Sequence, residues 1–144
     1  MIFLGTYKHN LDDKNRLTLP SKFIAKLPKH IFLSKGFEGC LEIRTPEEFE
    51  KRYQYLSQYS ENKKDSRNAS RIYFANSHDV EIDSAKRILV PNELISAAQL
   101  VKNTVIIGVG NKIEIWSESK YLKFQKDTSP MYETIAERLD DSNK

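Results

Sequence analysis

An aspartate followed four residues later by an arginine occurs twice in this 144-residue chain. The first copy runs from Asp12 to Arg16 and the second from Asp83 to Arg87, an offset of 71 residues, and a proline follows each arginine by four residues. An aspartate that enters a turn can accept hydrogen bonds from backbone amides two residues on, which fixes the shape of the turn. An arginine that leaves the turn can pair with that carboxylate or project toward phosphates and guanine edges. The pattern therefore predicts either two stapled turns or a surface that contacts nucleic acid.

Charge is divided unequally between the two copies. Residues 5–30 hold six lysines and arginines against two aspartates, a net +4, whereas residues 77–103 hold three against four acidic residues, a net −1. A cluster of cations on one loop must be solvated or matched, and phosphate is its commonest partner. We therefore expect a polyanion to bind at the basic first copy. The cations nearest the two turns are Lys8, Lys14, Arg16, Lys86 and Arg87.

The repeat extends well beyond the two turns. Apolar residues at 23, 24 and 27 recur at 94, 95 and 98, and Leu-Glu-Ile at 41–43 recurs as Ile-Glu-Ile at 113–115. A fixed period of this kind marks duplicated supersecondary units. Each copy spans about 45 residues, below the size at which a chain usually folds alone. We therefore expect the copies to share one core, between themselves or with neighbouring subunits, and the apolar strand at 104–109 to mediate association of subunits.

Hydrophobic periodicity predicts the same order of elements in both copies. Alternating apolar residues around each turn predict a half-buried hairpin, and the following proline can open a short helix. A third and a fourth strand follow. The predicted strands are 7–11, 17–19, 31–33 and 40–43 in the first copy, and 80–82, 88–90, 104–109 and 112–116 in the second.

Helical patterns follow each copy. Thr45-Pro46-Glu47-Glu48 is typical of a capping box at the start of a helix. A polar break at 57–62 separates this helix from a second one, in which residues 69, 72 and 73 share a face. In the tail, Ser129 is expected to cap a last helix that Pro130 opens, and residues 140–144 are expected to fray.

Composition favours a globular protein of one domain's length. Hydrophobic residues make up 39% of the chain and charged residues 30%, and no stretch reaches the 18 or so apolar residues of a membrane span. The one cysteine, Cys40, suits a reducing compartment and is expected to be a buried small hydrophobe. These features predict a cytoplasmic protein without a membrane segment.

Other classes of function have weak support. His9, His30 and His78 occupy unrelated repeat positions, so we expect no metal site. The aspartates of the two turns have no glycine-rich phosphate loop or nucleophile motif near them, so we expect neither an enzyme nor a cofactor. Four tyrosines could in principle form a base-stacking platform for single-stranded nucleic acid, but their core-like spacing on helices favours packing. They are Tyr53, Tyr55, Tyr59 and Tyr73.

Both copies, the interval between them and the run Val-Gly-Asn-Lys-Ile-Glu-Ile-Trp at 109–116 resemble the MraZ family of bacterial DNA-binding regulators. The resemblance covers the chain from Phe3 to about Leu139. It implies a β-rich α+β fold in which two tandem swapped-hairpin β-barrel repeats of the AbrB type form one pseudo-symmetric unit, with helices after each repeat. It also implies a homo-oligomeric ring of about eight subunits. Such a ring binds tandem repeats in double-stranded DNA upstream of the operon for cell division and cell-wall synthesis, where it regulates transcription.

The expected organisation has four parts. Residues 5–47 form the basic repeat with the DNA-binding loop, 48–75 a helical connector, 76–119 the second repeat and 120–144 a C-terminal helical segment. We expect a nucleoid-associated protein of the cytoplasm with no small-molecule substrate. The alternative is a self-assembling scaffold or partner-binding protein that does not read DNA, and the salt dependence of DNA binding separates the two.

The expected DNA contacts are the cations around both turns, with Asp12 and Asp83 ordering the loops. The family usually has glycine directly before each motif arginine, where this chain has Asn15 and Lys86. Asparagine visits left-handed backbone conformations readily, whereas lysine there costs about 1–2 kcal/mol. We therefore expect the second loop to differ in shape and Arg16 to be the stronger contact. The predicted DNA-binding residues are Arg16, Lys14, Asn15, Lys8, Arg87 and Lys86.

Overall fold

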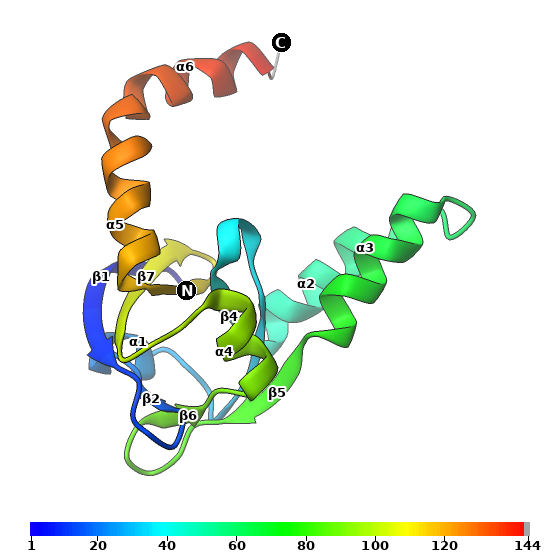
Figure 1. Cartoon of the computed structure of the whole chain (residues 1–144). Helices are drawn as coiled ribbons and strands as arrows, with labels where there is room; N and C mark the ends of the chain where they lie inside the picture. The colour runs from blue at the N-terminus through cyan, green and yellow to red at the C-terminus, as the bar shows by residue number, and fades with distance from the viewer. Residues whose placement is uncertain (143–144) are drawn as a thin grey trace.

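The structure is a computed structural model that describes residues 1–142, and its fold is α+β, as predicted (Figure 1). The first copy and its helices comprise β1 (Phe3–Asn10), β2 (Arg16–Thr18), α1 (Ser21–Ile24), β3 (His30–Lys35), the 3-10 turn η1 (Phe37–Gly39), β4 (Leu41–Arg44), α2 (Pro46–Ser57) and α3 (Lys64–Ala75). The second copy and its helices comprise β5 (His78–Glu81), β6 (Arg87–Leu89), α4 (Asn92–Ala98), β7 (Asn103–Gly110), β8 (Ile113–Ser117), α5 (Glu118–Asp127), the 3-10 turn η2 (Ser129–Met131) and α6 (Tyr132–Ser142).

The two copies exchange their first strands. Six strands form an antiparallel sheet in the order β1-β7-β8-β4-β3-β5, so β1 of the first copy pairs with β7 of the second and β5 of the second pairs with β3 of the first. The order is the same when the copies are interchanged, and its midpoint lies between β4 and β8. This exchange confirms the prediction of swapped hairpins in one pseudo-symmetric unit.

The second strands of the two copies form a separate two-stranded ribbon, β2–β6. Leu17 lies directly opposite Ile88, its own counterpart 71 residues later. The backbone bonds on either side are equivalent too: the Leu19 amide donates to the Lys86 carbonyl at 2.9 Å, and the Val90 amide donates to the Asn15 carbonyl at 2.9 Å. The local pseudo-two-fold axis therefore passes through this ribbon.

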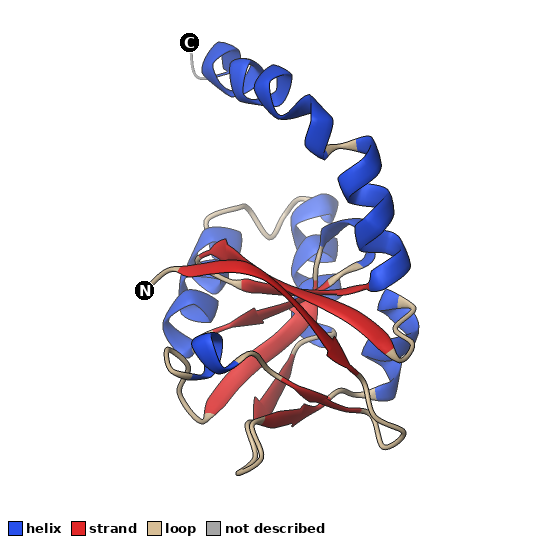
Figure 2. Ribbon diagram, turned by 90° about the vertical axis from the view of Figure 1, so that its left-hand side faces the viewer, coloured by secondary structure: helices blue, strands red, loops and turns tan. Residues whose placement is uncertain are grey.

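One hydrophobic core is shared by both copies. It fills the space between the six-stranded sheet on one side and the β2–β6 ribbon with α1 and α4 on the other (Figure 2). Of the two possibilities left open, the copies thus bury their apolar surface against each other. The largest fully buried side chains are Phe3, Leu17, Leu19, Phe23, Ile31, Leu33, Leu41, Ile43, Ile88, Leu94, Ile106 and Ile113.

The outer face of the sheet is covered by helix α5. Val105 and Ile107 of β7 pack there with Trp116 and Tyr121 and are nearly inaccessible to solvent. The expectation that strand 104–109 mediates association of subunits is therefore wrong for most of its length, because α5 of the same chain covers it. Val109 alone of its apolar side chains is exposed, at 39%.

Buried charges occupy the same outer face where the two copies meet. Glu42 and Glu114 lie directly opposite each other in the β4–β8 pair. The Glu42 carboxylate is held by Arg44 and by Lys112 at 2.6 Å, and Lys112 also contacts Glu114 at 3.5 Å. A buried carboxylate is tolerated only when it is paired in this way. The network fixes the β4–β8 register at the centre of the sheet.

The helical connector is attached to the sheet through aromatic rings. Phe49 of α2 stacks on Phe32 of β3 with ring centroids 4.2 Å apart.

Thr45 caps α2 as predicted, because its hydroxyl accepts a hydrogen bond from the Glu48 amide at 3.3 Å. Of the four tyrosines predicted to pack, Tyr73 is half-buried against Phe49 and Phe74, but Tyr53 is 51% exposed, and Tyr55 and Tyr59 are both 48% exposed. The physical reason is that α2 and α3 form a hairpin that stands away from the barrel (Figure 1).

The C-terminal helices begin differently from the prediction. The hydroxyl of Ser117 caps α5 by accepting from the Lys120 amide at 3.3 Å. Ser129 makes no capping bond, and Pro130 lies in the 3-10 turn η2 before α6 begins. Helix α6 extends to Ser142, so residues 140–142 are helical rather than frayed, and residues 143–144 lie outside the described part of the chain.

No helix within residues 1–142 has the length and apolar character needed to cross a membrane.

Candidate nucleic-acid interface

The first turn is organised by the carboxylate of Asp12. Its Oδ1 accepts hydrogen bonds from the backbone amides of Lys14 at 2.9 Å and Arg16 at 2.7 Å. Its Oδ2 accepts from the Arg16 side chain, through Nε, at 3.0 Å. The turn therefore closes on one side chain, and the same contact orients the arginine.

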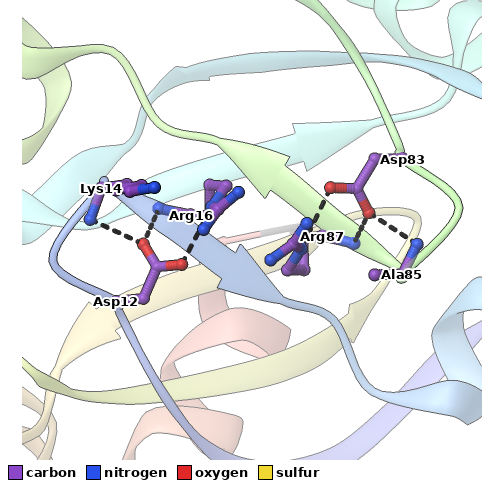
Figure 3. A network of polar contacts seen from close by, with 6 residues as sticks. All are labelled: Asp12, Lys14, Arg16, Asp83, Ala85 and Arg87. Carbon is purple, nitrogen blue, oxygen red and sulfur yellow. Dashed lines mark hydrogen bonds and ion pairs between the residues drawn. The ribbon is translucent and has the colours of Figure 1, made fainter.

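The second turn has the same geometry. Asp83 Oδ1 accepts from the amides of Ala85 and Arg87, both at 2.9 Å, and its Oδ2 accepts from Arg87 Nε at 3.0 Å (Figure 3). The residue before each arginine is left-handed, with φ of 63° at Asn15 and 64° at Lys86. The expectation that the second loop differs in shape is therefore wrong: Lys86 adopts the left-handed conformation despite its Cβ.

The two carboxylates are stabilised in their charged form. The backbone amide of Arg16 is the main cause that lowers the pKa of Asp12 below its ordinary value, and the Arg16 side chain and the Lys14 amide add to it. The amide of Arg87 lowers the pKa of Asp83 in the same way, together with the Ala85 amide and the Arg87 side chain. Each aspartate thus accepts hydrogen bonds within its own turn and stays ionised at neutral pH.

The β2–β6 ribbon brings the two arginines together. Leu17 and Ile88 point into the core, so their neighbours in each strand point outward. Figure 3 shows the guanidinium groups of Arg16 and Arg87 side by side, with Asp12 and Asp83 on the outer flanks. Within residues 1–142 the hydrogen bonds of both guanidiniums use Nε alone. The Nη atoms therefore remain able to donate to a phosphate or a guanine edge.

Lys14 and Lys86 stand in the two turns that flank the ribbon, and both side chains are exposed. Lys8 lies elsewhere. It faces Val105 directly across the β1–β7 pair, and residues directly opposite share one face of a sheet. Val105 packs with Trp116 beneath α5, whereas the ribbon covers the opposite face of the sheet. The structure thus groups the predicted residues of the two turns and leaves Lys8 apart from them.

Two residues of this surface were missed by sequence reasoning. Asn92, at the start of α4, accepts a hydrogen bond at 2.7 Å from the side-chain amide of Asn15 and so ties the first turn to the second copy. Leu89 lies opposite Arg16 in the ribbon and is 61% exposed. The alternation of Ile88 with Leu89 next to a motif arginine was the signal that could have placed Leu89 on the outer face.

Both motif carboxylates are occupied by hydrogen bonds within their own turns, so neither is positioned as a general base. Within residues 1–142 no three histidine, cysteine or acidic side chains are grouped to hold a metal ion. Cys40 is 2% exposed, which confirms its prediction as a buried hydrophobe, and burial raises the pKa of its thiol to about 12.

Comparison with known proteins gives a consistent result. The sequence model described as "MraZ protein, putative antitoxin-like" matches twice, at residues 2–72 and 73–143. A protein of Mesoplasma florum named "Transcriptional regulator MraZ" is 47% identical over 140 residues, which cover 96% of each chain. Proteins of the same name from Mycoplasmoides gallisepticum and Ureaplasma parvum are 43% and 37% identical, over 99% and 96% of this chain and 100% and 97% of theirs. Two matches in tandem agree with the duplication that the fold displays, and the chain belongs to the MraZ family.

Proposed function

We propose that this chain regulates transcription by binding double-stranded DNA through the β2–β6 ribbon and its two flanking turns. The observation that carries the proposal is the pair of equivalent Asp–Arg units set side by side on one outward face. The relatives named as transcriptional regulators support the same class of function. Two-stranded ribbons are one of the elements that proteins place in a DNA groove.

The proposed contacts divide by type. Lys14 and Lys86, exposed in the turns, neutralise phosphates and supply affinity that does not depend on sequence. Arg16 and Arg87 offer paired Nη donors, which suit guanine O6 and N7 or a phosphate. Asp12 and Asp83 hold the arginines in place by charge-assisted bonds, so little side-chain freedom remains to be lost on binding.

One subunit makes few contacts, so we propose that a homo-oligomeric ring of about eight subunits engages tandem repeats in DNA upstream of the cell-division and cell-wall operon. Once one subunit is bound, the next repeat meets its own subunit at a high effective concentration. Specificity then depends on the spacing of the repeats as well as on base contacts. In this proposal the protein acts in the cytoplasm, at the nucleoid, without a cofactor or a small-molecule substrate.

The test is a titration of labelled DNA from upstream of the protein's own operon, at several salt concentrations, with scrambled DNA of equal length as the control. Specific binding should fall steeply with salt, and Lys14→Ala should reduce the slope of log K against log salt by about one unit. A protein that assembles normally but binds both DNAs equally weakly would contradict the proposal. It would instead favour a scaffold without DNA readout.

A further inference from the structure

The C-terminal helix α6 carries an apolar stripe that its own chain leaves exposed. Tyr132 and Leu139 are 75% and 62% exposed, and they share a helix face with Ile135 and Ala136 because these positions are three and four residues apart. The helix has 11 residues, and isolated helices shorter than about 12–15 residues are marginal in water. Helix α5 begins on the sheet, where Tyr121 is buried, and Figures 1 and 2 show α6, which follows it, leading away from the barrel. Helix α6 therefore needs a packing surface that the described part of this chain does not supply.

An apolar groove of matching character lies elsewhere on the molecule. It has a volume of about 400 Å³ and lies between η1 and the α2–α3 hairpin. Phe37 and Ile72 both line it and are 69% and 58% exposed, and large exposed apolar patches often mark interaction sites. The groove is lined by the apolar and aromatic side chains of Phe37, Leu56, Ile72 and Tyr73 and by the cations Lys35 and Arg52.

The charges of the helix and the groove are opposite. Helix α6 contains four acidic residues and one arginine, whereas the groove is lined by the cations Lys35 and Arg52. Glu42 also lines the groove, but its carboxylate is already held by Arg44 and Lys112. The charged side chains of the lining that remain available are therefore Lys35 and Arg52, which complement an acidic helix.

We propose that α6 of one copy docks in the Phe37–Ile72 groove of a second copy, with its apolar stripe against the groove and its acidic residues facing Lys35 and Arg52. Figure 1 shows α6 and the α2–α3 hairpin leaving the barrel in different directions, so each copy offers the helix at one place and the groove at another. A contact between two different surfaces is heterologous, and its repetition closes into a ring when the rotation allows it. This inference rests on the proposed ring assembly and identifies the surfaces that build it.

Two single variants test the two sides of the contact. Leu139→Glu places a charge in the helix stripe, and Ile72→Glu places one in the groove. Both side chains are exposed within one chain, so neither change should disturb the fold. Thr134→Glu adds the same charge to the opposite face of α6 and is the matched control. Sedimentation velocity should show a single large assembly for the wild type and for Thr134→Glu, and monomers for the other two.

Mixing the two monomeric variants gives a sharper result. The Leu139→Glu chain keeps an intact groove and the Ile72→Glu chain keeps an intact helix, so one sound interface forms between them and a 1:1 dimer should appear. If neither change affects assembly, or if the mixture stays monomeric, then α6 packs in its own chain or against another α6, and the proposal is overturned.

DNA binding provides an independent readout. Both monomeric variants retain the β2–β6 ribbon, so their affinity for a duplex with one repeat should match that of the wild type within about twofold. On a duplex with several repeats they should lose the roughly 10²–10⁴-fold gain that linked contacts provide. If the wild type itself fails to bind either duplex while the mixing result holds, the DNA function is wrong and the interface remains.

Discussion

Arg16 lies directly opposite Leu89 across the β2–β6 ribbon, so a cation of the first copy and an exposed apolar side chain of the second form one outward-facing pair. The equivalent pair across the pseudo-two-fold axis is Arg87 with Thr18. The ribbon is therefore symmetric in its backbone and its arginines but differs in the residue beside each arginine.

Replacing Arg16 with alanine should lower the affinity for specific DNA by about 1–3 kcal/mol, because it removes a paired donor aimed outward. Arg87→Ala should have a smaller effect, because residues 77–103 carry a net charge of −1 against +4 for residues 5–30. Fluorescence anisotropy at fixed salt compares the two, with urea unfolding to check stability. Equal losses would show that the loops contribute alike, as their equal geometry allows.

Leu89→Ala should weaken binding to the cognate sequence more than binding to scrambled DNA, because an apolar side chain beside an arginine suits a thymine methyl group. The free energy of unfolding should change by less than about 0.5 kcal/mol, since the residue is exposed. Leu122→Ala in α5 removes a leucine that is 51% exposed and lies away from the ribbon, and it is the control. An identical effect of the two changes on DNA binding would exclude a role for Leu89 in readout.

Lys86→Gly should be more stable than Lys86→Ala by about 1 kcal/mol, because only the alanine variant keeps a Cβ at a φ of 64°. Both variants remove the same cation, so their DNA affinities should be similar. Urea midpoints measure the difference in stability. Equal midpoints would mean that the left-handed conformation at residue 86 is not strained.

Acid should remove the stabilisation that the two turn carboxylates provide. Because the folded-state pKa values of Asp12 and Asp83 lie below the ordinary value of 3.8, their contribution is complete above about pH 4 and is lost as the pH falls through the folded-state values. Asp12→Asn should therefore be less stable than the wild type at pH 7, with a difference that shrinks toward pH 2. Thermal unfolding across this range measures it, and a constant difference would show that ionisation of Asp12 does not stabilise the turn.

Cys40 should resist thiol reagents in the native protein. Burial raises its pKa to about 12, so at pH 8 almost none of the thiol is ionised, and the side chain is 2% exposed. A chromogenic disulfide reagent should label it only after urea is added. Stoichiometric labelling of the folded chain within minutes would show that the sheet opens readily at β4.

The repeat made much of this fold predictable from the sequence. The interval of 71 residues indicated equivalent turns, and alternation around Leu17 and Ile88 placed both strands with their apolar side inward. Pairing across copies was harder to foresee, because β1 is as compatible with its own copy as with β7. The pairing of β1 with β7 was indicated by the resemblance to the MraZ family and not by hydrophobic periodicity. Exposure on the helices was misjudged because spacing identifies a face of a helix but not whether a surface exists to cover it, as Tyr53 and Tyr59 show.

The candidate site was only partly predictable. The Asp-to-Arg spacing predicted the closed turn at Asp12. This was possible because the hydrogen bonds from nearby backbone amides to the aspartate are local and do not depend on the rest of the fold. The position of Lys8 depended on which sheet face β1 presents, which local spacing cannot fix. The Cβ of Lys86 was expected to change the shape of the second loop, but the hydrogen bonds of Asp83 and the pairing of the ribbon hold the backbone in the left-handed conformation.

The exchange of first strands also has a consequence for how the protein is made. Residue partners in the β1–β7 pair run from Phe3 with Gly110 to Asn10 with Asn103, so they are separated by 107 to 93 positions. The N-terminal strand must therefore emerge from the ribosome and wait through most of translation before its partner exists. During that interval β3 of the first copy also has an open edge until β5 follows, and both edges are exposed to other nascent chains. Nascent chains on neighbouring ribosomes of one mRNA would thus expose strands that can pair with each other. Exchange of strands between two chains would then compete with exchange within one chain, and a translational pause after residue 75 would favour it.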